Sequence, residues 1–194
     1  KNMNQILWTP TQDRIDASQM DSFRKQVNTR FHINLQDYHE LHKWSVSNIT
    51  NFCKAIWEFM AIEFSSDYTQ VVDDESKMPG AKWFDGARLN FAENLLRFRS
   101  DKPAIHFKGE DNPVRTLSYN ELFYEVEKLA SAMKNMGVQK GDLVAGFMPN
   151  MPETIIAMLA TTSIGAIWSS SSPDFGIKGV LDRFTQIKPK VLFA

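Results

Sequence analysis

The most informative stretch of this sequence is VAGFMPNMPETIIAMLATTSIGAIWSSSS, which occupies residues 144–172. It opens with an apolar run, 144–148, of the kind found in buried strands. Pro152 suits the first turn of a helix, because the N–H that it lacks would be unpaired there, and we expect that helix to run to about Ser163. A further strand is expected at 166–169. Strand, helix and strand together form the unit from which parallel sheets are built.

The same alternation continues on both sides of this stretch. The sequence predicts further elements of the same two kinds, namely strands at 103–107, 114–117 and 191–194 and helices from Ser118 to Gly137 and at 176–187. Ser118 and Glu121 form a capping box, and Gly137 is a typical helix stop. The whole pattern predicts an α/β fold with a mostly parallel sheet.

The first half of the chain is predicted to be helical. Ser18 can cap a helix that carries four apolar residues on one face, Met20, Phe23, Val27 and Phe31. A second amphipathic helix is expected from Ser47. Residues 65–82 show little periodicity and are interpreted as a connecting loop. These helices make only a thin core, so we expect them to pack on a larger body.

The difference between the helical first half and the alternating second half divides the chain into two segments. Residues 1–85 are expected to be a helical N-terminal extension, and 86–194 the first part of a large α/β domain. The last residues, 191–194, form a continuous apolar run typical of a strand that is buried on both faces. Because a natural enzyme would seldom end inside such a strand, we interpret the chain as a fragment with a truncated sheet, whose open edge favours self-association.

Composition excludes several classes of protein. The charges nearly cancel, with 22 Lys and Arg against 23 Asp and Glu, which argues against a nucleic-acid partner. Residues 154–173 are uncharged, but their hydroxyl groups and glycine argue against a membrane span. Cys53 is the only cysteine and cannot form an internal disulfide. Since the N-terminus also lacks the apolar run of a signal peptide, we expect a cytoplasmic protein.

Catalytic patterns are scarce. The nine glycines are scattered and form no phosphate-binding loop. His39 and His42 could share a helix face as two metal ligands, but no third ligand supports this, so we favour packing and predict no metal site. Cys53 lies on the apolar face of its helix and is interpreted as a buried, inert thiol. No catalytic residue is predicted in this chain.

The loop Ser169-Ser-Ser-Ser-Pro-Asp-Phe-Gly176 is the best candidate for a ligand contact. It follows a predicted strand and precedes a helix, at the end of the sheet where α/β proteins bind ligands. Small side chains there allow close approach of a ligand, and their hydroxyls can donate to it. A ligand-facing loop and simple tight packing both remain open.

At these residues the sequence resembles the acetoacetate–CoA ligase branch of the acyl-adenylate-forming, or acyl-CoA synthetase, superfamily. The stretches that carry the resemblance are LHKWS (41–45), WFDGARLNFAEN (83–94), TLSYNEL (116–122), GVQKGD (137–142) and IGAIWSSSSPDFG (164–176). The resemblance as a whole covers about residues 38–194. The last stretch is the most specific, because acetyl-CoA synthetases typically have an aromatic residue and two glycines at the position of Ser172-Pro-Asp174.

The resemblance implies an enzyme that uses ATP, CoA and Mg²⁺ to convert acetoacetate to acetoacetyl-CoA through an acyl-adenylate. It implies that Ser172, Pro173 and Asp174 line the CoA pocket. The ATP-binding loop and the catalytic lysine of the family are not among these 194 residues. We therefore expect the fragment alone to be inactive, to bind no cofactor, and to need the remainder of its own chain as a partner.

Two alternatives remain open. Another short-chain acyl-CoA synthetase, specific for acetate or propionate, would differ only in pocket residues that lie further along the chain. A non-enzymatic scaffold or interaction module would also fit a chain without a visible catalytic residue.

Overall fold

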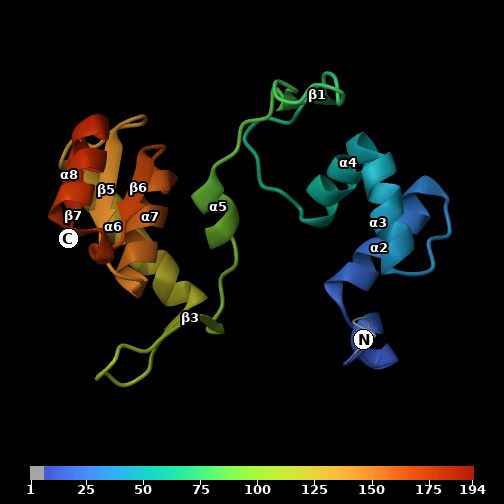
Figure 1. The fold of residues 1–194 in the computed structure, drawn as a ribbon, viewed down its shortest axis with the longest axis horizontal. Helices are drawn as coiled ribbons and strands as arrows, with labels where there is room; N and C mark the ends of the chain where they lie inside the picture. The colour runs from blue at the N-terminus through green and yellow to red at the C-terminus, as the bar shows by residue number, and fades with distance from the viewer. Residues whose placement is uncertain (1–6) are drawn as a thin grey trace, which may run out of the picture. The chain divides into compact units, whose positions relative to one another are not determined.

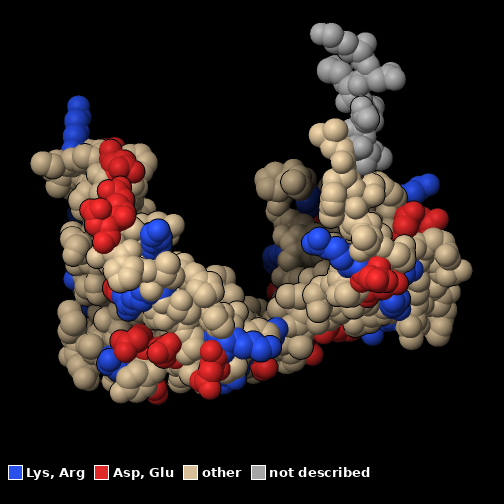
Figure 2. Space-filling model, turned by 90° about the horizontal axis from the view of Figure 1, so that it is seen from below, with Lys and Arg blue, Asp and Glu red and all other residues tan. Residues whose placement is uncertain are grey.

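The computed structural model describes residues 7–194, which form two compact units. The first unit extends to Arg88, and the second runs from Leu89 to Ala194. In Figure 1 the first unit consists mainly of helices, whereas the second has helices around a sheet. No helix within residues 7–194 is long and apolar enough to cross a membrane. On the face shown in Figure 2, basic and acidic residues are interspersed over both units.

Within residues 7–88 the first unit contains four helices and one hairpin. They are α1 (Gln12–Asp16), α2 (Gln19–Phe31), α3 (Tyr38–Ser47), α4 (Ile49–Phe59) and the antiparallel strands β1 (Gln70–Val72) and β2 (Trp83–Asp85). Ser18 caps α2 as predicted, since its Oγ accepts the Asp21 N–H at 3.1 Å. Asp37 caps α3 in the same way, accepting from the Glu40 N–H at 2.9 Å.

The core of the first unit corrects two predictions. Phe23, Val27, Leu41 and Ala55 are buried, but Met20 is 50% exposed and does not share their environment. The second predicted helix begins at Ile49 and not at Ser47, because Ser47 is the last residue of the separate helix α3. Asn48 ends α3 by donating from Nδ2 to the Trp44 carbonyl at 3.0 Å.

The predicted loop at 65–82 is wrong in part, because it contains strand β1. Only Val71 and Val72 in this strand are buried, so a three-residue strand leaves almost no periodic signal. Asp73 organises the connection between β1 and β2. Its carboxylate accepts from the Asp74 and Lys82 N–H groups at 2.8 Å each and pairs with Lys77 Nζ at 2.9 Å.

The second unit alternates strands and helices. Its elements are α5 (Phe91–Leu96), β3 (Pro103–Phe107), β4 (Arg115–Ser118), α6 (Tyr119–Asn135), β5 (Leu143–Phe147), α7 (Pro152–Ser163), β6 (Ile167–Ser171), the 3₁₀ turn η1 (Pro173–Phe175), α8 (Gly176–Ile187) and β7 (Val191–Phe193). The capping box is confirmed, because the Glu121 N–H donates to Ser118 Oγ at 3.2 Å and the Ser118 N–H donates to Glu121 Oε2 at 2.7 Å.

The predicted parallel sheet is confirmed for three strands, in the order β6-β5-β7. Strands β3 and β4 instead form a separate antiparallel hairpin. The chain leaves the central strand β5 for β6 through α7, then returns past β5 to β7 through α8 (Figure 1). Because such crossovers are right-handed, the two helices cover opposite faces of the sheet, and the strand order reverses between β5 and β7.

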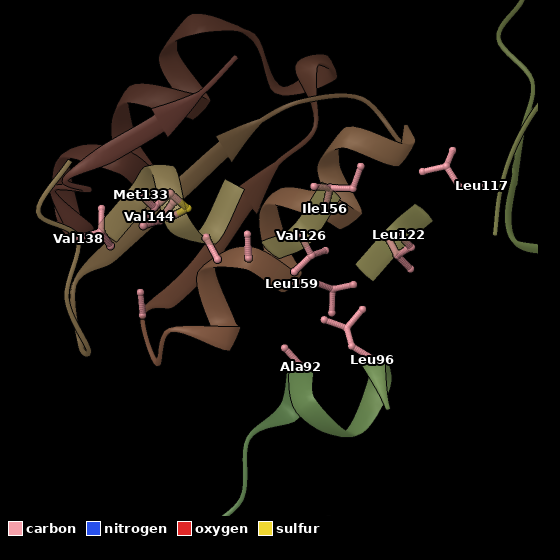
Figure 3. Packing of buried hydrophobic residues seen from close by; sticks show 13 residues of the cluster. Ala92, Leu96, Leu117, Leu122, Val126, Met133, Val138, Val144, Ile156 and Leu159 are labelled. Carbon is pink, nitrogen blue, oxygen red and sulfur yellow. The ribbon is translucent and has the colours of Figure 1, made fainter. Parts of the chain in front are cut away.

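The core of the second unit lies between the sheet, α6 and α7. Val144 of β5, Val126 and Met133 of α6 and Leu159 of α7 are buried there. In Figure 3, Leu96 of the short helix α5 points toward the same cluster. Apolar burial of this kind is the main stabilising contribution to the unit.

Asn90 attaches α5 to α7. Its Oδ1 accepts the Glu93 N–H at 3.1 Å, which caps α5, and its Nδ2 donates to the Thr162 carbonyl at 2.9 Å and the Ser163 carbonyl at 3.3 Å. One amide thus satisfies backbone groups at the start of one helix and at the end of another.

A candidate ligand-binding edge of the sheet

The three parallel strands end at the same edge of the sheet. β5 ends at Phe147, β6 at Ser171 and β7 at Phe193. Ligands of open α/β sheets bind outside the carboxyl ends of the strands, where the order reverses. This edge is therefore the candidate site, and its two parts are the turn after β6 and a hollow beside β7.

The turn after β6 contains the three predicted site residues. Ser172 Oγ accepts the Asp174 N–H at 3.3 Å and donates to Asp174 Oδ2 at 2.8 Å, so the two side chains close the turn on each other. Pro173 occupies the first position of the 3₁₀ turn. Pro173 and Asp174 are exposed, whereas Ser171 before them is buried. The structure places this predicted segment at the edge of the sheet and leaves its surface open.

Phe175 and Gly176 finish the turn and start α8. Gly176 has φ of +62°, a conformation that glycine adopts at little cost. The Arg183 guanidinium lies 4.1 Å from the centre of the Phe175 ring. The ring is nonetheless 52% exposed, so the turn presents both an apolar surface and a positive charge. Sequence reasoning did not identify Arg183, because its contact with Phe175 exists only once α8 has formed.

The hollow beside β7 has a volume of about 490 Å³. Its floor is apolar and its rim is charged, and the lining residues are Arg115, Glu125, Lys128, Leu129, Ala132, Met148, Glu153, Ile156, Ala157 and Phe193. None of the predicted residues Ser172, Pro173 and Asp174 lines it. The hollow was not predicted, because α6, α7, β4 and β7 all contribute to it.

The charges at the rim of this hollow are paired. Arg115 forms an ion pair with Glu153, and Lys128 Nζ lies 3.0 Å from Glu125 Oε1. Partial burial opposes ionisation of Glu153, but the bonds from Arg115 and from the backbone outweigh it, so the pKa of Glu153 lies below its ordinary value. A carboxylate held ionised in this way suits ion pairing better than proton transfer.

The other residues considered from sequence lie in the first unit. His39 and His42 are both on α3, and their rings lie 5.8 and 6.2 Å from the ring of Tyr38. Cys53 on α4 is partly buried, and this burial raises the pKa of its thiol. Among residues 7–194 no three His, Cys, Asp or Glu side chains group as ligands of a metal ion would.

Comparison with known proteins identifies the families involved. Residues 91–194 match the family of AMP-binding enzymes, and residues 38–95 match the N-terminus of acetyl-coenzyme A synthetase. An acetoacetyl-CoA synthetase of Macaca fascicularis is 45% identical over 98% of this chain, and one of Rhizobium meliloti (strain 1021) is 46% identical over 95%. The chain spans 28% of the length of each.

A solved structure agrees with these matches. The acetoacetyl-CoA synthetase from Streptomyces lividans is 39% identical and superimposes with a TM-score of 0.89. The match covers 97% of this chain and 30% of that one. The similarity therefore includes the helical first unit as well as the sheet.

Proposed function

Because the chain belongs to the family of AMP-binding enzymes, we propose that it is the N-terminal part of an ATP-dependent acetoacetate–CoA ligase. The observation that carries this proposal is the extent of the similarity. It runs over 98% of the chain for a relative named acetoacetyl-CoA synthetase, at 45% identity. The Ser-Ser-Ser-Ser-Pro-Asp-Phe-Gly segment at 169–176 supports the acetoacetate branch in particular.

The proposed reaction has two steps. A carboxylate oxygen of acetoacetate attacks the α-phosphorus of ATP, which forms acetoacetyl-AMP and releases pyrophosphate. The CoA thiolate then attacks the acyl carbon, which forms acetoacetyl-CoA and releases AMP. Mg²⁺ is expected to accompany ATP, and we assign no metal ligand to residues 7–194. Acetoacetate, ATP and CoA would all bind to the complete enzyme.

This chain is proposed to supply the scaffold and one wall of the CoA pocket. Residues 1–85 would be the helical extension, and 86–194 the first part of the AMP-binding domain. We expect the phosphate-binding loop and the adenylating lysine in the remainder of the full-length protein, which would align with the part of the relatives that this chain does not cover. The 194 residues alone are therefore expected to be inactive and to bind neither ATP nor CoA.

Ser172, Pro173 and Asp174 are proposed to contact CoA through its pantetheine arm. The exposure of Pro173 and Asp174 at the carboxyl edge of the sheet supports this. A carboxylate at Asp174 repels phosphate, so the neutral arm is the more suitable part of the ligand. Closure of the turn by Ser172 and Asp174 also supports a shaping role, in which Pro173 and Phe175 present the contact surface.

The proposed function is tested on the complete reading frame. The DNA that encodes this chain is read beyond Ala194, and the whole protein is assayed for ATP–pyrophosphate exchange with acetoacetate, acetate and propionate. Acetoacetate should support the highest kcat/KM. A higher kcat/KM with acetate or propionate would mean that the enzyme uses that acid and not acetoacetate. A stop codon directly after Ala194 would favour a non-enzymatic module.

The CoA contact is tested separately in the complete protein. Asp174→Asn and Pro173→Gly should raise the KM for CoA several-fold and leave pyrophosphate exchange unchanged, because exchange needs no CoA. Asp111→Asn, in the turn between β3 and β4, is the matched surface control. An unchanged KM for CoA in both turn variants would remove these residues from the pocket.

We also propose a cytosolic location, which a single cysteine without an internal disulfide supports. Acetoacetate, ATP and CoA would then be supplied from the same compartment.

A further inference from the structure

A second hollow lies in the first unit and plays no part in the proposed reaction. It has a volume of about 320 Å³, and its lining residues come from the end of α4 and the segment that follows: Trp57, Glu58, Ala61, Ile62, Phe64, Asp67 and Tyr68. It combines the aromatic rings of Trp57, Phe64 and Tyr68 with the carboxylates of Glu58 and Asp67.

The aromatic side chains of this hollow pack against Phe84 of β2. The Trp57 ring stacks on Phe84 of β2, with centroids 4.6 Å apart and planes at 26°. Tyr68 meets both rings edge-on at 5.4 and 5.3 Å. Phe64 lies 5.8 Å from Trp57 and is 42% exposed. Phe84 therefore supports Trp57, while Trp57, Phe64 and Tyr68 form a wall that faces the hollow.

Two residues at this wall have a backbone that is unfavourable for their type. Ala61 has φ of +46° and Phe84 has φ of +49°. Ala61 follows the C-cap of α4, where its N–H donates to the Glu58 carbonyl at 3.0 Å and the Ile62 N–H donates to the Trp57 carbonyl at 3.3 Å, so its left-handed backbone is a common way to end a helix. Phe84 is a strand residue, and left-handed backbone at a bulky residue persists only where the surroundings enforce it.

The charges around the hollow favour a cation. Among its described lining residues the charged side chains are Glu58 and Asp67, both acidic. Arg30 pairs with Glu58 at 2.7 Å from outside the lining. Burial raises the pKa of Tyr68, the charges of Glu58 and Asp67 raise it further, and Arg30 offsets part of the effect. The phenol thus experiences a net negative field.

From this geometry we propose that the hollow binds a quaternary ammonium group. Such a cation is weakly hydrated, donates no hydrogen bond, and is attracted to the faces of Trp, Tyr and Phe within about 6 Å. Trp57, Phe64 and Tyr68 would contact its methyl groups, and Asp67 would supply the opposite charge. A primary ammonium needs hydrogen-bond acceptors and would compete with Arg30 for Glu58.

Binding is tested by NMR on the 194-residue chain with choline as the probe. The five tryptophans provide separate indole N–H signals, and choline should shift that of Trp57 in a saturable manner. The matched ligand is 3,3-dimethyl-1-butanol, which has the same shape without the charge and should bind at least fivefold more weakly. Equal shifts with both ligands, or no saturable shift with choline, would overturn the proposal.

Variants separate the ring contact from the charge. Phe64→Leu and Asp67→Asn should each weaken choline binding about threefold to tenfold. Phe98→Leu removes an exposed ring from the second unit and is the control that should leave affinity unchanged. If both hollow variants keep the wild-type affinity and an unchanged Trp57 spectrum, the site lies elsewhere and the proposal fails.

A third arm identifies the source of the cation. A short peptide that carries trimethyl-lysine is compared with its unmodified form and with choline. Tighter binding of the modified peptide than of choline points to a methylated protein, and the reverse order points to a free small molecule.

Discussion

A Cβ atom at Gly146 would lie 2.5 Å from Cη2 of Trp168. The indole of Trp168, on β6, therefore lies against the bare backbone of the central strand β5. From there it reaches Phe193 on β7, with ring centroids 6.2 Å apart. One missing side chain thus allows a single ring to connect all three strands near the edge where ligands are expected.

We predict that Gly146→Ala destabilises the chain by about 1–3 kcal/mol, because the added methyl overlaps the indole. The measurement is urea unfolding followed by circular dichroism. In a Trp168→Leu background the same change should become neutral or stabilising by up to about 1 kcal/mol, since alanine restricts the unfolded chain more than glycine does. Equal penalties in both backgrounds would show that the ring is not the cause.

Asn90 offers a second test. Asn90→Asp keeps the acceptor that caps α5 but removes the amide donors and places a charge beside the carbonyls at the end of α7. We expect losses of about 1–3 kcal/mol for both Asn90→Asp and Asn90→Ala in urea unfolding. Asp37→Asn is the matched control at the cap of α3 and should change stability by less than about 0.5 kcal/mol. A neutral Asn90→Asp would mean that only the cap matters.

The contacts of Asp73 predict that the stability of the fold depends on pH. The bond from Lys77 and those from the Lys82 and Asp74 N–H groups lower the pKa of Asp73 to about 2, against about 3.9 in an unfolded chain. A carboxyl with a lowered pKa stabilises the fold above pH of about 4, and this contribution is lost as the pH falls toward 2. Carboxyl ¹³C NMR should therefore show titration of Asp73 near pH 2.

The same effect should be absent from Asp73→Asn, whose stability relative to wild type should improve between pH 4 and 2. If Asp73 titrates near its ordinary value, the bonds that close the β1–β2 connection do not persist in solution.

Strand β7 leads to a prediction about association. It is an edge strand of the described sheet, and Leu192 on it is 51% exposed. Unpaired strand edges attract other strands, so we expect the 194-residue chain to self-associate with rising concentration in light scattering. Leu192→Lys should suppress the effect, because a charge on an edge strand opposes pairing. A monomer at all concentrations would contradict this prediction.

The sequence alone was most informative where structure is determined locally. The capping box of Ser118 and Glu121, the start of α7 at Pro152 and the bounds of α8 follow from residues within a few positions of one another. Strand β1 and helix α3 were harder to predict. A three-residue strand has no measurable period, and the boundary of α3 depends on the single side chain of Asn48.

The candidate site also has one part that the sequence predicted and another that it did not. The turn at Ser172, Pro173 and Asp174 was predicted from its small residues and its place after a strand, and its contact with CoA stays a prediction. The hollow beside β7 and the aromatic hollow at Trp57 were not predicted. Their walls combine residues that are distant in sequence, such as Arg115 with Phe193, or depend on support such as that of Phe84 behind Trp57.

The sequence by itself determined the alternation of strands and helices, their caps and the acyl-CoA synthetase resemblance, because periodicity and capping act over a few residues. Only the tertiary structure decided the strand order β6-β5-β7, the passage of Trp168 over Gly146 and the two hollows. These features depend on which distant side chains meet, and that is settled by packing across the sheet and between helices.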